Sequence, residues 1–262
     1  MDTSELQKLI LRGRFMRETG IALLVASGLL AIFLFIPLTP KEVVSEPVAV
    51  ATSTAPNAFA QVPLQAKAAI VYDLALGETL YEKNAEVQLP LASLTKLLTV
   101  YAALAELPSN TSVTIPAEAT RLEGPHAFFE GQTFSLADLA RLTLVASLND
   151  GAAAIAHATA LHENRSQQMM LAGAVASLGL SQTYAVNGNG LDENSFISGG
   201  YGSARDMARL AGAFVEKSPS IAEATTKEYA LAVSQGGQSF KVKNTNPMRD
   251  TIPRLLLSKT GY

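Results

Sequence analysis

The chain has 262 residues, 48% of them hydrophobic, with 18 glycines and 12 prolines, a composition that excludes collagen-like, low-complexity and disulfide-rich folds. Because 20 Lys and Arg residues stand against 23 Asp and Glu residues, the formal net charge is −3, which offers no basic field to nucleic acid. The absence of cysteine also excludes zinc–thiolate sites, iron–sulfur clusters and thiol nucleophiles, so covalent chemistry falls to Ser, Thr, Lys or a carboxylate.

An apolar run at residues 19–40 contains 22 residues without a charge, which is long enough to cross a bilayer as a helix. Four Lys or Arg residues precede the run and only Lys41 follows it closely. The positive-inside rule therefore predicts a cytoplasmic N-terminus at residues 1–18 and a body outside the membrane. A cleaved signal peptide is the alternative, but its small-x-small site at residues 58–60 lies about twenty residues beyond the run. We expect an uncleaved signal-anchor.

Residues 41–63 have the composition of a tether. Prolines at positions 40, 47, 56 and 63 are spaced among Ala, Ser, Thr and Val residues. Such a segment cannot bury enough apolar surface to fold, so we expect it to be disordered and semi-extended. It would hold the body within reach of a substrate near the membrane or in the cell wall.

The body, residues 64–262, opens with two β-type runs at 68–73 and 79–84 around a Gly-containing loop, which predicts a hairpin. Residues 91–107 are apolar on nearly every side and contain no Gly or Pro, which predicts a buried central helix. A short strand is expected at residues 112–115.

Helical patterns dominate the middle of the body. Ser135 with Asp138, and Ser203 with Asp206, have the spacing of helix N-terminal caps. The predicted helices lie at 135–147, 151–162, 166–180 and 203–217, and the β-type runs that follow lie at 229–233, 239–243 and 253–259. Strands, a mainly helical block and further strands predict an α+β fold in which a sheet carries a helical insertion.

A candidate nucleophile and base lie at the start of the central helix. Ser93 and Lys96 are three residues apart and so share one helical face, near the N-terminal end where free N–H groups favour negative charge. Lysine is a useful base only where burial or a neighbouring cation lowers its pKa. One Ser-x-x-Lys is expected by chance in a chain of this length, so the pair alone is weak evidence.

Two further motifs strengthen that interpretation. Ser147 and Asn149 lie at a junction between two predicted helices, where they could face a cleft or merely cap a helix. Lys259, Thr260 and Gly261 end a β-type run and offer a cation, a hydroxyl and room for a ligand backbone, although a solvated strand end would look the same. Ser-x-x-Lys, Ser-x-Asn and Lys-Thr-Gly in this order are the motif set of penicillin-binding proteins and serine β-lactamases.

From about residue 66 to its end, the sequence resembles the low-molecular-mass penicillin-binding proteins, the serine-type D-alanyl-D-alanine carboxypeptidases. The resemblance extends to the segments around each motif and to the Gly-Leu-Asp turn at residues 190–192. It implies a β-lactamase/transpeptidase-like fold: an antiparallel sheet shared by the hairpin and the Lys-Thr-Gly strand, with an inserted helical subdomain forming the other wall of the cleft. It implies no cofactor and no metal.

The resemblance also implies the catalytic roles. Ser93 would attack the carbonyl between two terminal D-Ala residues of a peptidoglycan stem peptide, and Lys96 would take its proton. Ser147 would relay a proton to the leaving D-Ala. Asn149 would hold the substrate and the ammonium group of Lys96.

The remaining implied roles belong to substrate binding. Lys259 and Thr260 would bind the terminal carboxylate, and Lys259 would help to keep Lys96 neutral. Gly261 would give the ligand room, and the backbone N–H groups of Tyr262 and Ser93 would form the oxyanion hole. β-Lactams, which mimic D-Ala-D-Ala, would acylate Ser93.

Two alternatives remain open on the sequence. A class A-like β-lactamase should carry a Glu-x-x-Leu-Asn element and usually Asp in the middle of the second motif, where this chain has Leu148. A catalytically silent, membrane-tethered wall-binding protein is the non-enzymatic alternative. It gains support because the family fold continues beyond its third motif whereas this sequence ends at Tyr262, so we expect a C-terminally truncated domain that lacks one sheet edge and folds poorly.

Weaker patterns carry no function. His126, His157 and His162 lack metal-ligand spacing to nearby carboxylates. Gly188 and Gly190 resemble part of a dinucleotide fingerprint, but no βαβ unit surrounds them.

Overall fold

The computed structural model describes residues 16–17, 19–21, 23–24, 27, 59 and 63–261. The chain divides into two units, residues 1–57 and residues 58–262. The predicted membrane span and tether lie almost wholly outside the described residues. Among those that are described, no helix has both the length and the hydropathy that a membrane crossing requires.

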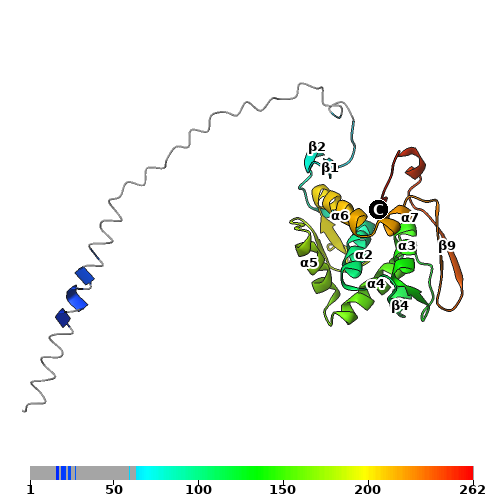
Figure 1. Cartoon of the computed structure of the whole chain (residues 1–262), viewed down its shortest axis with the longest axis horizontal. Coiled ribbons are helices and arrows are strands. Elements are labelled where there is room, and N and C mark those ends of the chain that lie inside the picture. The colour runs from blue at the N-terminus through cyan, green and yellow to red at the C-terminus, as the bar shows by residue number, and fades with distance from the viewer. Residues whose placement is uncertain are drawn as a thin grey trace, which may run out of the picture. The chain divides into compact units, whose positions relative to one another are not determined.

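The second unit combines a helical block with short antiparallel strand pairs (Figure 1). Its α-helices are α2 (Thr95–Glu106), α3 (Leu136–Ala146), α4 (Asn149–His162), α5 (Gln167–Ser177), α6 (Ala204–Lys217) and α7 (Pro219–Ala224). Its strands are β1 (Ala69–Asp73), β2 (Glu78–Lys83), β3 (Leu89–Pro90), β4 (Ser112–Thr114), β5 (Thr133–Ser135), β6 (Tyr184–Ala185), β7 (Gly200–Gly202), β8 (Tyr229–Val233) and β9 (Ser239–Lys243). Three 3-10 turns are η1 (Ala92–Leu94), η2 (Ala119–Arg121) and η3 (Arg249–Thr251).

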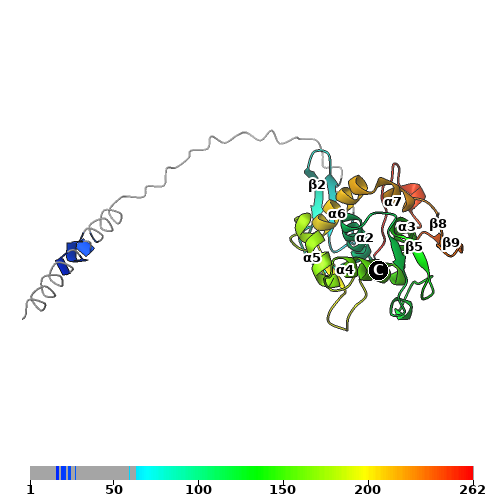
Figure 2. The same ribbon diagram turned by 60° about the horizontal axis from the view of Figure 1, so that its bottom comes forward.

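Helix α2 is the predicted buried central helix. It packs against α3, α4, α5 and α6, and both views place it in the middle of the block (Figures 1 and 2). Leu98, Val100 and Ala103 are fully buried. Because the helix is covered on all sides, polar side chains in its first turns are removed from water with it, and Lys96 is one of them.

The predicted helix caps are confirmed. The Ser135 hydroxyl accepts from the backbone N–H of Asp138 at 3.1 Å, and the Ser203 hydroxyl accepts from that of Asp206 at 3.1 Å. Each cap satisfies an N–H group that has no partner within its own helix. The caps fix where α3 and α6 begin, and α3 ends directly before Ser147.

Within the described residues, four small antiparallel sheets replace the single sheet that the resemblance implied. Their ladders are β1–β2, β3–β7–β6, β4–β5 and β8–β9. The prediction of a strand at 253–259 is wrong, because no described backbone pairs with this segment. Side chains hold it instead: the hydroxyl of Thr225 accepts from Ser258 N–H at 2.8 Å, and the Asn246 amide donates to the Ser258 hydroxyl at 2.8 Å.

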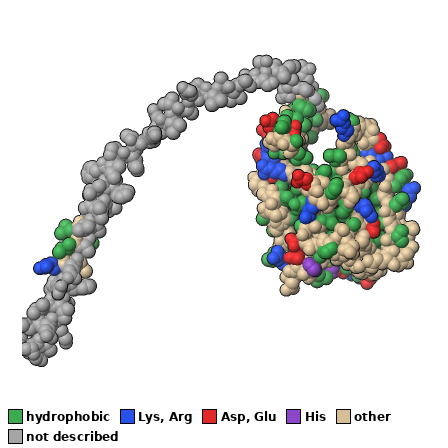
Figure 3. All heavy atoms as spheres, viewed as in Figure 1, with side chains coloured by type: hydrophobic (Ala, Val, Ile, Leu, Met, Phe, Trp, Pro, Cys, Tyr) green, Lys and Arg blue, Asp and Glu red, His purple; other side chains and the backbone are tan. Residues whose placement is uncertain are grey.

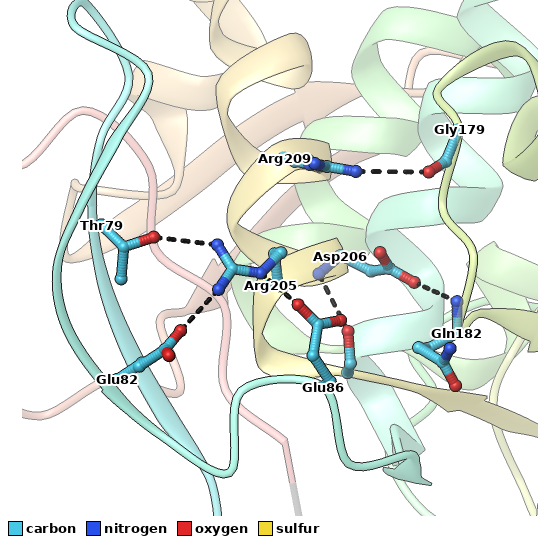
Figure 4. A network of polar contacts seen from close by, with 9 residues as sticks. Thr79, Glu82, Glu86, Gly179, Gln182, Arg205, Asp206 and Arg209 are labelled. Atoms are coloured by element: carbon cyan, nitrogen blue, oxygen red, sulfur yellow. Dashed lines mark hydrogen bonds and ion pairs between the residues drawn. The ribbon is translucent and has the colours of Figure 1, made fainter. Parts of the chain in front are cut away.

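An arginine on α6 connects the β1–β2 hairpin to the helical block (Figure 4). Arg205 donates to Glu82 on β2 at 2.5 Å, to Thr79 at 2.9 Å and also to Glu86. The next residue, Asp206, is buried and accepts from the backbone N–H of Gln182. Two neighbouring residues on one helix thus fix the hairpin on one side and the loop before β6 on the other.

The core extends from the helices to the β8–β9 hairpin. The rings of Phe128, Phe134 and Phe240 pack together with centroid separations of 5.0 to 5.5 Å. Strand β8 lies against α3, which gives it alternating buried and exposed residues. On the face of this unit seen in Figure 3, basic and acidic side chains are interspersed, as the near balance of charges in the sequence predicts.

Candidate active site

Ser93 lies in the 3-10 turn that leads into α2. The preceding residue, Ala92, has a positive φ of 45°, which is unusual for a residue with a side chain. A hydrogen bond to strand β7 holds this turn in place: Leu91 N–H donates to the carbonyl of Gly200 at 2.9 Å. A strained backbone that its surroundings hold in place is a common feature of a nucleophile's turn.

Lys96 is fully buried one turn after Ser93. Its Nζ donates to Ser93 Oγ at 2.9 Å and to the backbone carbonyl of Asn189 at 2.6 Å. Burial lowers the pKa of Lys96 to about 8, because the charged form loses its hydration. About a tenth of the Lys96 side chain is therefore neutral at pH 7 and about half at pH 8, in hydrogen-bond contact with the hydroxyl whose proton it would take.

Ser147 and Asn149 occupy the junction between α3 and α4. Ser147 ends α3 in the left-handed conformation, with φ 58° and ψ 39°, and is 6% exposed. Asn149 begins α4, and its side-chain amide donates to the backbone carbonyl of Glu123 at 2.6 Å. The expected contact between Asn149 and Lys96 is not among the hydrogen bonds of the described residues, and the carbonyl of Asn189 holds the Lys96 ammonium instead.

Lys259, in the C-terminal segment, contacts the second serine of the site. Its Nζ donates to Ser147 Oγ at 2.8 Å and to the backbone carbonyl of Thr260 at 2.7 Å. Burial and the positive charge of Lys96 together lower the pKa of Lys259 to about 7. Repulsion between the two ammonium groups thus acts on Lys259, whereas burial accounts for the shift at Lys96.

Thr260 and Gly261 line the same site. The hydroxyl groups of Thr260 and Thr245 are 2.7 Å apart, and Gly261 lies against Leu94 of the nucleophile's turn. Tyr262, predicted to supply an oxyanion N–H, lies outside the described residues.

These residues surround one cleft of about 520 Å³. Ser93, Ser147, Asn149, Thr260 and Gly261 all line it. A volume of this size takes a short peptide end or a β-lactam. The polar groups that line it come from segments far apart in sequence, among them those of Ser93, Asn149 and Thr260. The arrangement provides a nucleophile, an adjacent amine, a second hydroxyl and a cation, which are the groups that an acyl-transfer reaction requires.

Sequence reasoning missed three residues of this site. Asn189 acts through its backbone carbonyl, which has no sequence signature, and Thr245 gains its position only from the fold. The sequence indicates Gly190 only as part of a weak nucleotide pattern and of the Gly-Leu-Asp turn at residues 190–192, with no role of its own. Its φ is +80°, and a Cβ at this position would collide with the carbonyl oxygen of Ala92, so the glycine lets two loops of the cleft touch.

Replacing Gly190 by alanine should lower stability and disturb the nucleophile. We expect Gly190→Ala to cost about 2–3 kcal/mol, from the unfavourable φ and the collision with Ala92, and to slow acylation of Ser93. Thermal unfolding and the rate of penicillin labelling measure the two effects. Gly173→Ala, in the exposed part of α5 with nothing within 4 Å of the added Cβ, is the matched control and should be neutral or stabilising. Equal melting temperatures for the two variants would contradict the steric account.

The fold and cleft define a penicillin-binding, transpeptidase-like protein, and comparison with known proteins agrees. A D-alanyl-D-alanine carboxypeptidase of Mycobacterium tuberculosis superposes with a TM-score of 0.66 at 27% identity, covering 77% of this chain and 75% of that one. Penicillin-binding protein D2 of Listeria monocytogenes, solved in an ampicillin-bound form, gives a TM-score of 0.63 at 27% identity, covering 77% of this chain and 80% of that one.

Sequence comparison identifies the family. The D-alanyl-D-alanine carboxypeptidase family matches residues 52–262. A D-alanyl-D-alanine endopeptidase of Pseudomonas aeruginosa is 30% identical over 82% of this chain and 70% of its own length. A D-alanyl-D-alanine carboxypeptidase of Bacillus subtilis is 29% identical over 79% of this chain, which spans 56% of that relative. The chain belongs to the D-alanyl-D-alanine carboxypeptidase family of serine peptidases.

Proposed function

We propose that the protein removes the terminal D-Ala from peptidoglycan stem peptides through an acyl-enzyme on Ser93. One observation carries the proposal. Two serine hydroxyls line a single cleft, and the buried Lys96 amine contacts that of Ser93 at 2.9 Å while the Lys259 amine contacts that of Ser147 at 2.8 Å. Each hydroxyl therefore has an amine of lowered pKa beside it, which is what proton transfer to and from the reacting groups requires.

The reaction then has two halves. Ser93 Oγ attacks the carbonyl carbon of the penultimate D-Ala while Lys96 takes the hydroxyl proton, and the ester forms as the peptide C–N bond breaks. Ser147 passes its proton to the leaving amine and takes one from the Lys96 ammonium group, so that free D-Ala departs and Lys96 is neutral again. Water then loses a proton to the Lys96 amine and attacks the ester, and Lys96 gives that proton to Ser93 Oγ as the ester C–O bond breaks. The backbone N–H of Ser93 supplies one oxyanion donor, and such donors are each worth about 2.7–4 kcal/mol.

In this proposal the two lysines have different protonation states: Lys96 is the neutral base and Lys259 is the cation that binds the substrate carboxylate. Only one of two close ammonium groups is easily charged in such a site, because repulsion and burial both oppose the second charge. A substrate carboxylate at Lys259 and Thr260 would favour the proton on Lys259. Binding of the correct substrate would thereby leave Lys96 neutral and ready to act as the base.

The dependence of kcat/KM on pH should reflect the protonation of Lys96 and Lys259. Below pH 7 both amines are charged and Lys96 cannot accept a proton, and above pH 8 the pair loses the cation that binds the carboxylate. We expect kcat/KM for a D-Ala-D-Ala peptide to form a bell with its maximum between pH 7 and 8. In Lys259→Arg, which stays charged, the alkaline limb should disappear while the acid limb remains. An activity that rises steadily to pH 10 would contradict the account.

Three assays of the wild-type chain test the proposed reaction against its alternatives. A carboxypeptidase releases D-Ala from a pentapeptide and turns over β-lactams slowly. Rapid, repeated hydrolysis of a chromogenic cephalosporin would instead indicate a β-lactamase, and neither activity in a folded chain would indicate a silent wall-binding protein. Two relatives, from Pseudomonas aeruginosa and Escherichia coli, are endopeptidases, so cleavage of a cross-linked peptide dimer is assayed beside the pentapeptide.

The proposed location follows from the sequence. The apolar run at residues 19–40 with its preceding basic residues would anchor the chain in the cell membrane, and residues 41–63 would tether a catalytic domain, residues 64–262, outside it. This placement puts the cleft on the side of the membrane where stem peptides are exposed.

A further inference from the structure

Strand β8 presents large apolar side chains to solvent. Its outward residues, Tyr229, Leu231 and Val233, are 39%, 66% and 55% exposed. The residues between them, Ala230 and Ala232, are buried against the core. The solvated face of an antiparallel sheet is normally polar, whereas here the larger apolar side chains lie on the outside. Packing within this unit therefore does not account for these three side chains.

Two lysines on β9 border this apolar row. Tyr229 pairs with Lys243 and Leu231 with Lys241, so all four side chains share the outward face. The Lys241 ammonium group lies 4.1 Å from the centre of the Tyr229 ring, which holds a cation beside the row. The third outward residue of β9 is a serine, and the nearest acidic residue along the chain, Glu228, precedes β8. The outward face of the two strands thus carries two cations and no carboxylate.

The β8–β9 face consists of Tyr229, Leu231, Val233, Lys241 and Lys243. Both views place β9 at the outer edge of the second unit (Figures 1 and 2). Strand β9 ends at Lys243, and Thr245, two residues further along the chain, lines the catalytic cleft. A surface bound by the β8–β9 face would therefore lie close to the cleft.

We propose that the β8–β9 face docks on a membrane surface rich in anionic lipids. Its apolar side chains would enter the boundary between headgroups and acyl chains, a position that suits the amphipathic ring of Tyr229. The ammonium groups of Lys241 and Lys243 would stay at the level of the headgroups and bind lipid phosphates. A soluble anion would contact the lysines but leave the apolar row in water, whereas an anionic bilayer complements both parts of the face.

This inference goes beyond the proposed reaction and uses only the proposed location, in which residues 41–63 tether the domain to a membrane. An extended chain spans at most about 3.3–3.6 Å per residue, so these residues could reach about 80 Å. A tether of that length permits the β8–β9 face to turn toward the bilayer. Docking would then hold the cleft near the membrane surface instead of at a varying distance from it.

Tryptophan fluorescence tests the docking, because the chain contains no tryptophan of its own. The full-length variant Leu231→Trp is reconstituted into vesicles of brominated phosphatidylcholine, a quencher, with or without about 30 mol % phosphatidylglycerol. We expect quenching to be about five-fold stronger on the anionic vesicles than on the neutral ones. Leu161→Trp is the matched control, since Leu161, at the end of α4, is 67% exposed, and it should be quenched weakly on both.

The same assay tests the two lysines. Each lysine near an anionic surface strengthens binding about five-fold, so adding Lys241→Gln/Lys243→Gln to Leu231→Trp should reduce quenching to its level on neutral vesicles. Equal quenching of Leu231→Trp and Leu161→Trp on anionic vesicles, or quenching that survives the lysine replacements, would overturn the proposal. So would a shift of Leu231→Trp emission that depends on the number of chains per vesicle and not on lipid charge, because a second copy would then cover the face.

Two further measurements separate the docking from the proposed location and function. Flotation with neutral vesicles reports whether the chain is anchored, and a chain that does not float would count against the proposed location while the anionic vesicles still test the β8–β9 face. Release of D-Ala from a soluble pentapeptide should be the same in the wild-type chain and in Lys241→Gln/Lys243→Gln, because neither lysine lines the cleft. No release from either protein would count against the proposed function and leave the quenching result standing.

Discussion

Replacing Ser93 by alanine should reduce D-Ala release from a pentapeptide by at least about 10⁴-fold. The hydroxyl is the only group in the proposed mechanism that bonds to the substrate, and removal of such a nucleophile leaves only the weak catalysis of the remaining site. Without the Ser93 hydroxyl, the first step of the proposed mechanism, in which Lys96 takes its proton, cannot occur. The measurement is single-turnover release of D-Ala, detected by coupled oxidation, at enzyme concentrations high enough to follow slow reactions.

Folding controls make this loss interpretable. Alanine leaves the backbone of the η1 turn unchanged, so the Ser93→Ala melting temperature should lie close to that of the wild-type chain. Ser177→Ala, at the end of α5 and outside the cleft, removes a comparable hydroxyl and should retain full activity. If Ser93→Ala kept more than a tenth of the wild-type rate, a different nucleophile would have to be found.

Removing the Lys96 amine should lower the rate of penicillin acylation by about 10²–10⁴-fold, the usual worth of general base catalysis. Methionine is the informative replacement, because it fills a similar volume without a charge to bury. Since burial of the ammonium group already costs free energy, as its lowered pKa shows, Lys96→Met should fold at least as stably as the wild-type chain. Acylation rates and thermal melts of the two proteins check both statements.

Arginine at the same position distinguishes a base from a structural cation. Lys96→Arg keeps a positive charge near Ser93 and Asn189 but cannot give up its proton in the accessible pH range. If Lys96 acts as a base, this variant should be as slow as Lys96→Met, or slower because of the added bulk. Retention of half of the wild-type rate in Lys96→Arg would show that the charge, and not proton transfer, is what the site requires.

Local patterns predicted the helices well, since the forces that define them are local. Ser135 and Ser203 cap helices where their spacing to Asp138 and Asp206 predicts. The prediction of a strand at residues 253–259 was wrong because strand formation depends on contacts with distant parts of the chain. A short apolar run such as that at residues 255–257 indicates only a preference. A strand exists only where another backbone supplies its hydrogen bonds, and the described residues contain no such partner for this segment.

The sequence predicted those residues of the candidate site that act through their side chains. Ser93, Lys96, Ser147 and Lys259 belong to motifs. The fold places them in two hydrogen-bonded pairs, and the serine of each pair lines the same cleft. Asn189 could not be found in the same way, because its contact with Lys96 uses a backbone carbonyl that every residue has.

The most direct test of the acyl-enzyme is to find the covalent bond itself. The full chain is incubated with benzylpenicillin, its intact mass is measured, and the modified peptide is located by fragmentation. The account predicts one adduct with the mass of the whole penicillin molecule, carried by the peptide that contains Ser93 and absent from Ser93→Ala. A folded wild-type chain that gains no adduct, or one that carries it on another residue, would contradict the account.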